Sequence, residues 1–545
     1  MLSLYADTLS EVSNFLSKKE YEQFRKSCKL IRNEFKYCHH LCLNNKNSLK
    51  YYRDEEFKEK VLKTISNPRE QLSLDLSGTN VYITDDLNDL YGLNLSRCPN
   101  VTSLELLTKI KVLNVSHCRV NDVSMLVDLI ELDVSNCEYM SNFDMLKKLK
   151  RLNVENCKLF YDISKISYIE DLNISGSYRI FDLSPLINIK KLNFKNCLNI
   201  QTLPKFTNLN ELTLFESSIT DVSSLSEIRE ISLSYCHKIV DVSPLKNLYY
   251  LSIKNCKKIT DVTSLTNVHK IRLENITITD VSGLSTSYEV RLSSINVIDV
   301  SRLNNVNTLT LDNCNRIKDI SMLKNVKILQ LSNLSNVTNV YVSYGMDELT
   351  IHRCNNIHKI INHGNLHIFN LTYCNIRNIS SILGTHTVNI SDCKNINDIS
   401  YLNESYEISL SHCHKITDIS FLSSSKTLNK LKLSCFDNIK IPELHNLHTL
   451  EMYNCVIFNL PEMHNLHTLD LTYCSGIIDV STFKNVHTLK LSYCHEIIDV
   501  SPLKNVKILT LENCRKITDV SMLGDVDELN IDKCESIVHL PLLTR

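Results

Sequence analysis

The chain has 545 residues, with 60 basic and 61 acidic side chains, a net charge of −1, nine glycines and nine prolines. This balance gives no electrostatic attraction to nucleic acid or to an anionic membrane, and no apolar run is long enough to span a bilayer. The closest two glycines, Gly78 and Gly92, lie too far apart for a dinucleotide fingerprint, a phosphate-binding loop or a nucleophile elbow. The start of the chain lacks the features of a signal peptide, so an intracellular, cytoplasmic location is expected.

Residues 1–43 carry two amphipathic helical patterns. In each pattern apolar residues recur at spacings of three or four, which places them on one face of a helix. The first set is Leu9, Val12, Phe15 and Leu16, and the second is Tyr21, Phe24, Cys28 and Ile31. Two such helices are too small to bury a core alone, so they must pack on the rest of the chain, on a partner, or on both.

From Leu4 to Ile31 the chain resembles the F-box. Leu4 takes the place of its leading Leu, Glu20-Tyr21 that of its Asp-Leu, and Cys28-Lys29 that of its Cys-Arg/Lys. Tyr5, Ser27 and Ile31 depart from the usual Pro, Val and Trp. The resemblance implies docking on the Skp-type adaptor of a cullin–RING ubiquitin ligase. The residues that would bind this adaptor are Leu4, Leu9, Val12, Phe15, Leu16 and Tyr21.

The alternative for this segment is an N-terminal cap that shields the first repeat from water, and the two roles can coexist. The cysteines and histidines at its end fit no usual zinc-finger spacing, so we expect no metal there. They are Cys28, Cys38, His39, His40 and Cys42. Residues 44–71 are expected to form a connector and N-terminal cap, and residues 44–63, which are polar, are expected to contain one more helix.

A repeat of 19–20 residues organises residues 72–545, in about 24 units. The unit that starts at Val486 reads V-H-T-L-K-L-S-Y-C-H-E-I-I-D-V-S-P-L-K-N. Its paired Leu489 and Leu491 predict a short strand with both side chains on one face. The Asp of Asp-Val-Ser can cap one helical turn. Because so short a unit cannot hold a full helix, the outer side is expected to be 3₁₀ or extended.

These units resemble the Cys-containing leucine-rich repeat, and their I-T-D-V-S-x-L half is similar to internalin repeats. The expected fold is therefore a repeat solenoid, an α/β-type arc with a parallel, concave β-sheet and a short 3₁₀ or extended convex side. An N-terminal F-box followed by leucine-rich repeats is a known architecture. The composition is similar to that of F-box/leucine-rich-repeat proteins of large amoeba-infecting DNA viruses, which would place the chain in the host cytoplasm.

Two ladders of potential metal ligands run along the repeat. The recurring cysteines, from Cys98 onward, are interpreted as a free core ladder, because parallel side chains are poorly placed for disulfides. His448, His467 and His487 occupy one position in three consecutive units. They could bind a metal or respond to pH, or they could form a solvated row. We expect no cofactor.

The residues between and after the paired Leu should face the concave side. In the first units they are mostly Asn, and later they carry mixed charges and several Tyr, a residue favoured in protein interfaces. The alternative is an ordinary solvated surface. The residues predicted to bind a ligand are Tyr235, Tyr373, Tyr473, Tyr493, Lys490 and Asp470.

These observations predict a non-catalytic protein-recognition subunit. The resemblance implies the substrate receptor of an SCF-type ubiquitin ligase, in which the F-box docks the adaptor and the repeats bind the target protein. The alternative is a stand-alone scaffold or inhibitor that binds one protein and recruits no ligase. No nucleic acid or membrane partner is expected.

Overall fold

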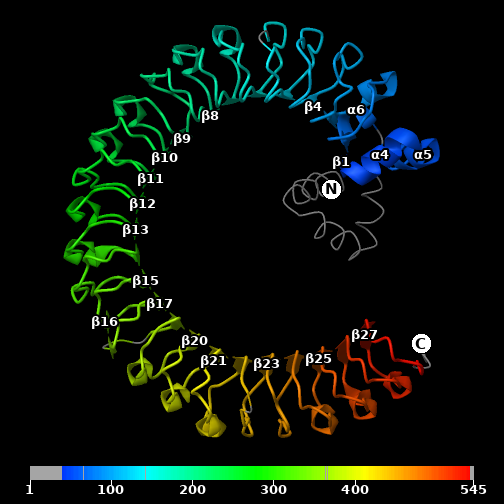
Figure 1. Ribbon diagram of the computed structural model, residues 1–545, viewed down its shortest axis with the longest axis vertical. Coiled ribbons are helices and arrows are strands. Elements are labelled where there is room, and N and C mark those ends of the chain that lie inside the picture. Colours follow the sequence, from blue (N-terminus) through cyan, green and yellow to red (C-terminus); the bar gives the residue numbers. More distant parts are fainter. Residues whose placement is uncertain are drawn as a thin grey trace, which may run out of the picture. The chain divides into compact units, whose positions relative to one another are not determined.

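The computed structural model describes residues 40–65, 67–140, 143–362, 364, 366–437 and 439–540 (Figure 1). The chain divides into two compact units: unit 1 ends at Lys258 and unit 2 begins at Ile259. The predicted adaptor-binding residues, from Leu4 to Tyr21, lie outside the described residues, so the F-box interpretation stays a prediction. Within the described part, no helix is long and apolar enough to cross a membrane.

From residue 40 on, the described part of unit 1 has one strand and three short helices ahead of the repeats. β1 (Leu41–Leu43) pairs in parallel with β2 (Leu72–Asp75). Between them lie α4 (Asn45–Arg53), α5 (Glu55–Leu62) and α6 (Pro68–Gln71). The side chains of Asn44, Asp54 and Asn67 each accept a backbone N–H at the start of one helix. The expectation of a single helix here was wrong because each of these caps starts a separate one.

These helices are fastened to the first coils by side-chain bonds. The buried Ser48 hydroxyl donates to the Leu43 carbonyl at 3.0 Å and accepts the backbone N–H of Asp75 at 2.8 Å. The Lys58 ammonium lies 2.8 Å from the Asp86 carboxylate. Burial raises the pKa of Tyr51 to about 12, with smaller contributions from Asp86 and Glu55. β1 covers the edge of β2 that would otherwise be open, and these bonds hold the helices beside that pair.

The repeat strands of unit 1 pair in parallel and in chain order. Leu side chains alternate with half-exposed polar ones, as expected for a sheet with one buried face. β3 to β8 are three residues long, and β9 to β11 are five. The strands are β3 Gly92–Asn94, β4 Val112–Asn114, β5 Glu131–Asp133, β6 Arg151–Asn153, β7 Asp171–Asn173, β8 Lys191–Asn193, β9 Glu211–Phe215, β10 Glu230–Ser234 and β11 Tyr250–Lys254.

Unit 2 has the same arrangement, and the strands of its main sheet are all five residues long, like β9 to β11. They are β12 Lys270–Glu274, β13 Glu289–Ser293, β14 Thr308–Asp312, β15 Ile328–Ser332, β17 Glu348–His352, β19 Ile368–Thr372, β20 Thr387–Ser391, β21 Glu407–Ser411, β22 Lys430–Ser434, β23 Thr449–Tyr453, β24 Thr468–Thr472, β25 Thr488–Ser492, β26 Ile508–Glu512 and β27 Glu528–Asp532. Two further strands, β16 (Asn339–Val342) and β18 (Lys359–Asn362), form a separate parallel pair. There the Asp-Val-Ser turn is replaced by residues with strand propensity.

The outer side carries short 3₁₀ turns, which confirms that part of the predicted fold. The backbone N–H of Ser243 donates to Asp241 at 2.8 Å, and the same bond recurs, for example from Ser420 to Asp418. The 3₁₀ turns are η1 Asp85–Asp89, η2 Ser164–Ile166, η3 Ser184–Leu186, η4 Ser223–Leu225, η5 Ser243–Leu245, η6 Ser282–Leu284, η7 Ser301–Asn305, η8 Ser380–Ile382, η9 Ser400–Leu402, η10 Ser420–Ser424, η11 Ser481–Phe483, η12 Ser501–Asn505 and η13 Ser521–Leu523.

The repeating cysteines are buried and unbridged throughout the described part of the chain. Their thiols donate to backbone carbonyls of the preceding coil, as from Cys98 to Leu76 at 3.1 Å and from Cys137 to Val115 at 3.2 Å. Burial raises the pKa of Cys157 and Cys494 to about 12, so both stay protonated at neutral pH. This confirms the interpretation as a core ladder.

The residue before each cysteine position has a left-handed backbone, with φ between 50° and 60°. Non-glycine residues seldom adopt this conformation, and Asn and Asp adopt it most readily. We call these positions the turn row. The preference explains why Asn136, Asn156, Asn255, Asn275 and Asn513 recur there, and it shows that much of the Asn content follows from backbone geometry.

Candidate binding surfaces

The middle row, the residue between the paired apolar side chains of each strand, has a structural task in unit 1. Asn94 and Asn153 each accept a hydrogen bond at Oδ1 from the backbone N–H two residues later, at 3.0 and 3.1 Å. Asp75, Asn114, Asp133 and Asn173 do the same. Because the side chain satisfies this N–H, the strand ends at the Asn or Asp after three or four residues.

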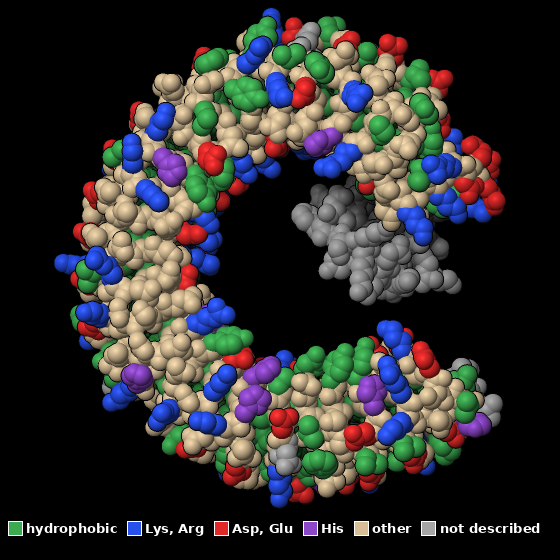
Figure 2. Space-filling view, in the orientation of Figure 1, with side chains coloured by type: hydrophobic (Ala, Val, Ile, Leu, Met, Phe, Trp, Pro, Cys, Tyr) green, Lys and Arg blue, Asp and Glu red, His purple; other side chains and the backbone are tan. Residues whose placement is uncertain are grey.

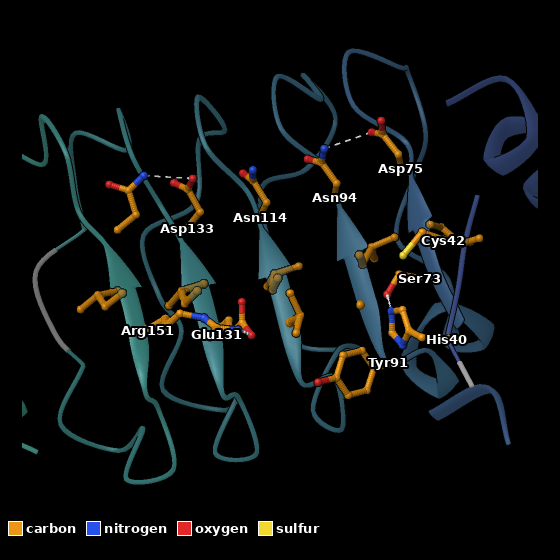
Figure 3. A pocket seen from close by; sticks show the side chains of 18 of the residues that line it. His40, Cys42, Ser73, Asp75, Tyr91, Asn94, Asn114, Glu131, Asp133 and Arg151 are labelled. Carbon is orange, nitrogen blue, oxygen red and sulfur yellow. Dashed lines mark hydrogen bonds and ion pairs between the residues drawn. The ribbon is translucent and has the colours of Figure 1, made fainter. Parts of the chain in front are cut away.

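The same row is linked across strands by its second polar atom. Asn94 Nδ2 donates to Asp75 Oδ1 at 3.0 Å, and Asn153 Nδ2 donates to Asp133 Oδ2 at 3.0 Å (Figure 3). The inner surface of unit 1 therefore presents side chains that are already held in place.

A cavity of about 650 Å³ lies over this surface and is lined by residues from β1 to β7. Figure 3 shows Asp75, Asn94, Asn114 and Asp133 along one side and His40 and Tyr91 on the other. The Arg151 guanidinium pairs with the Glu131 carboxylate of the neighbouring strand. The lining is thus a row of carboxamides and carboxylates, with an aromatic corner at one end.

That aromatic corner depends on a glycine. The rings of His40 and Tyr91 meet edge to face at 4.8 Å, and His40 Nε2 lies 3.1 Å from the Ser73 hydroxyl. A Cβ on Gly92 would lie 2.5 Å from the same hydroxyl. The absence of a side chain at Gly92 therefore leaves the Ser73 hydroxyl room to contact His40.

In unit 2 the middle row carries charged side chains that form ion pairs with side chains of the neighbouring strand. Lys490 lies 3.2 Å from Asp470, and both residues were predicted to bind a ligand. Glu451 contacts Lys430 at 3.1 Å and Lys432 at 3.2 Å. Burial alone would raise the pKa of Glu451, but the hydrogen bonds from the two lysines outweigh it and the pKa is lowered. Side chains of both signs are interspersed over the visible surface of each unit (Figure 2).

Three tyrosines on consecutive coils of unit 2 form what we call the tyrosine cluster. The rings of Tyr473 and Tyr493 stack at 4.2 Å with an interplanar angle of 16°, and Tyr453 meets Tyr473 edge to face at 5.5 Å. Tyr453 is 49% exposed and Tyr473 is 44% exposed. Tyr473 and Tyr493 are turn-row residues with φ of 56°, whereas Tyr453 is the last residue of β23.

The structure brings four of the six predicted ligand-binding residues together and leaves two elsewhere. Tyr473, Tyr493, Asp470 and Lys490 lie on or directly after β24 and β25. Tyr235 belongs to unit 1, where it contacts Phe215 at 5.3 Å. Tyr373 lies after β19, and the Arg353 guanidinium lies over its ring at 5.3 Å. Their part in binding stays a prediction.

Tyr453 was missed by the sequence reasoning, which took its tyrosines only from the position directly before the cysteine. Tyr453 stands one position earlier, and Asn454 occupies the turn row. Beside this cluster a hollow of about 270 Å³ is lined by His412, His414, Cys435, Tyr473 and others. The aromatic residue two positions before Cys455 was the available signal.

A second set of rings lies at the opposite ends of the strands, in what we call the leading row, the residue before each strand. His448 stacks on His467 at 4.7 Å and 7°, and His467 on His487 at 4.3 Å and 15°. Each Nδ1 lies 3.1–3.4 Å from the hydroxyl of the following Thr. Burial lowers the pKa of His467, followed by the effect of His487 and His448.

Metal binding by such clusters finds no support in the geometry. Among the described residues, no group of three or more His, Cys, Asp or Glu side chains could hold a metal ion. The three imidazoles stack face to face, so their nitrogens do not converge on one point.

No protein-family model matches the sequence, and no curated protein matches it. Among solved structures, the chain is similar to an internalin (inlF) from Listeria monocytogenes, known from a crystal structure at 1.91 Å. The sequence identity is 19%, the match covers 64% of this chain and 88% of that chain, and the TM-score is 0.32. The leucine-rich-repeat architecture of this chain follows from its own parallel strands, buried leucines and capped outer turns.

Proposed function

We propose that the chain is a non-catalytic protein-recognition subunit, and that the tyrosine cluster of unit 2 is the centre of its binding surface. A leucine-rich-repeat sheet is typically a binding scaffold, and partner proteins bury large polar–aromatic surfaces of this kind. Tyr combines apolar area with a polar hydroxyl, and it is enriched among the residues that dominate binding energy.

The observation that carries the proposal is the backbone at Tyr473 and Tyr493. Left-handed geometry costs a bulky residue about 1 kcal/mol relative to the residues that favour it. A stacked aromatic pair returns a similar amount, about 0.5–1.5 kcal/mol. Tyr therefore gives no net stability over the Asn found in the same row. What Tyr adds is ring surface, 44% exposed at Tyr473 and partly exposed at Tyr493, which a bound protein can cover.

A double substitution at the turn row tests this directly. The full chain and the variant Tyr473→Asn/Tyr493→Asn are compared by quantitative affinity capture from the cells in which the protein acts. The expected result is that partners recovered by the wild type fall at least about tenfold with the variant. Asn is already the commonest type in this row, so thermal unfolding should be unchanged.

The matched control is Tyr235→Asn, which makes the same change in the same row of unit 1. It should leave capture unchanged if the cluster, and not turn-row tyrosine in general, binds the partner. Equal recovery by the wild type and the double variant would overturn the proposal.

We also propose that the bound protein is presented to a ubiquitin ligase, with the chain acting as its cytoplasmic substrate receptor. This rests on the F-box-like pattern from Leu4 to Ile31, followed by leucine-rich repeats. The full chain should co-purify with a Skp-type adaptor, and Leu9→Asp or Phe15→Asp should abolish this. If the wild type retains no adaptor, the ligase role fails and the stand-alone scaffold or inhibitor remains.

A further inference from the structure

We propose that the inner cavity of unit 1 is a second binding site, which takes an extended, Arg- or Lys-rich segment of a partner protein. The site is separate from the tyrosine cluster and does not rest on the function proposed for it. The argument uses the shape of the cavity, its charge and the way its acidic residues are placed in the repeat.

The shape suits an extended chain. The cavity of about 650 Å³ is lined by strands β1 to β7, which lie side by side. At about 4.8 Å between strands, seven strands span about 29 Å, the length of about nine residues of extended peptide. Such a segment would lie across the strands, where the carboxamides of Asn94, Asn114 and Asn153 each keep at least one amide hydrogen and one oxygen lone pair for its backbone beside the bonds that they already make.

The charge selects a basic occupant. Four carboxylates line the cavity, those of Asp75, Glu131, Asp133 and Asp171, against one guanidinium, that of Arg151. Arg151 is already paired with Glu131. At the aromatic corner, Tyr91 offers a ring against which a guanidinium can stack.

The acidic residues are not required by the fold. Asp75 and Asp133 accept the backbone N–H two residues later, but Asn94, Asn114 and Asn153 make the same bond in sister coils. Asp171 stands at the first position of β7, where sister strands begin with Gly92, Val112, Glu131, Arg151 or Lys191. Neutral residues would build the same surface, so the negative charge is a feature added to it.

The test uses the full chain and a fluorescein-labelled nine-residue peptide of alternating Arg and Ser, with the Glu–Ser peptide as its charge-reversed counterpart. Fluorescence anisotropy should show saturable binding of the Arg peptide only, weakening as salt rises from 50 to 200 mM. Absence of saturable binding to the wild type overturns the proposal.

The decisive variant is Asp75→Asn/Asp133→Asn/Asp171→Asn, which keeps the side-chain acceptors at Asp75 and Asp133 that end the strands. Its affinity for the Arg peptide should fall by about tenfold or more. The matched control is Asp162→Asn/Asp182→Asn/Asp221→Asn, which removes the same charge from outer caps. Asn378 makes the cap bond in its own coil at 2.7 Å, so Asn is tolerated there.

The control variant should bind the peptide like the wild type. If both triple variants weaken binding equally, the peptide responds only to the net charge of the protein and the proposed site is wrong. Tyr473→Asn/Tyr493→Asn should bind the Arg peptide normally, so failure of this site and failure of the tyrosine cluster are separately visible.

Discussion

The middle row of the sheet does different work in the first coils of unit 1 and in unit 2. In unit 1, Asn153 Oδ1 accepts the backbone N–H of Glu155, Asn153 Nδ2 donates to Asp133, and β6 ends there. In unit 2, Asn370 and Asn389 are bonded side chain to side chain at 2.8 Å, and their strands run on for two more residues. The side chain at one repeat position therefore binds the backbone of its own coil in one region, and in the other region it binds only another side chain on the surface. The residue type alone does not reveal which.

The largest expected difference between the two regions is in stability. Asn153→Ala removes a backbone acceptor and a cross-strand donor together, and should lower the free energy of unfolding by about 1–2 kcal/mol. Thr310→Ala, in the middle row of unit 2, removes only a side-chain bond of 3.1 Å to Gln330 and should cost about 0.5 kcal/mol or less. Urea unfolding of the full chain measures both. Equal losses of stability would show that the middle row has the same structural role in both units.

The repeat and its backbone could be predicted from the sequence because Leu489, Leu491 and Cys494 recur with a fixed period and each coil shares the same core. The Asp caps followed from the short chain available for each turn. The extra strands β16 and β18 could not be predicted from the sequence, because a coil without the Asp-Val-Ser turn can adopt several extended conformations. The tyrosine cluster could be predicted only in part. Tyr473 and Tyr493 lie in the turn row, directly before a cysteine, whereas Tyr453 joins them only through ring packing across coils.

The unit 1 cavity was not foreseen for a different reason. Its lining comes from six repeat strands, β2 to β7, and from β1, which lies before the repeat begins, and its corner depends on His40 meeting Tyr91. Such a contact joins residues with no shared period.

A smaller, local difference should appear on acidification. Because the pKa of His467 is lowered in the folded chain, the unfolded chain binds more protons below its own pKa of about 6.5. Stability near β23–β25 should therefore fall as pH drops from about 6.5 through the folded pKa. In unit 1 the leading row around β6–β8 holds Lys150, Glu170 and Lys190, with Lys190 2.9 Å from Glu170, and these charges persist in that window.

Hydrogen exchange at pH 7 and pH 5, corrected for intrinsic rates, measures this local opening. Peptides covering β23–β25 should lose protection, and those covering β6–β8 should not. His467→Asn places in the stack a residue that unit 2 already uses at Asn307 and Asn429 in the leading row, and it should reduce the pH response. Equal loss in both regions would contradict a role for the stacked imidazoles.

Tyr493→Asn should change stability still less. Relief of the left-handed backbone and loss of the stack on Tyr473 nearly cancel, so the free energy of unfolding should shift by about 0.5 kcal/mol or less. Urea unfolding beside Asn153→Ala gives the comparison. A loss of more than about 1 kcal/mol would show that the tyrosine cluster is structural, which would weaken the binding surface proposed for unit 2.

The smallest effect is expected on the outer caps, where the two units should behave alike. Hydrogen bonds from Ser400 lower the pKa of Asp398, and hydrogen bonds from Ser184 lower that of Asp182. A carboxyl whose folded pKa is lowered contributes stability above its unfolded pKa of about 3.9, and this contribution is lost as pH falls through the folded value.

Asp398→Asn keeps the oxygen that accepts the cap hydrogen bond but removes the titrating carboxyl group. At neutral pH this change should lower the free energy of unfolding by about 0.5 kcal/mol or less. Its deficit relative to the wild type should shrink below pH 4, as followed by circular dichroism. Asp182→Asn should trace the same curve, because the cap bond is 2.8 Å in unit 1 and 2.9 Å in unit 2. A curve that differed between these variants would mean that the units diverge in their outer turns as well as along the inner strands.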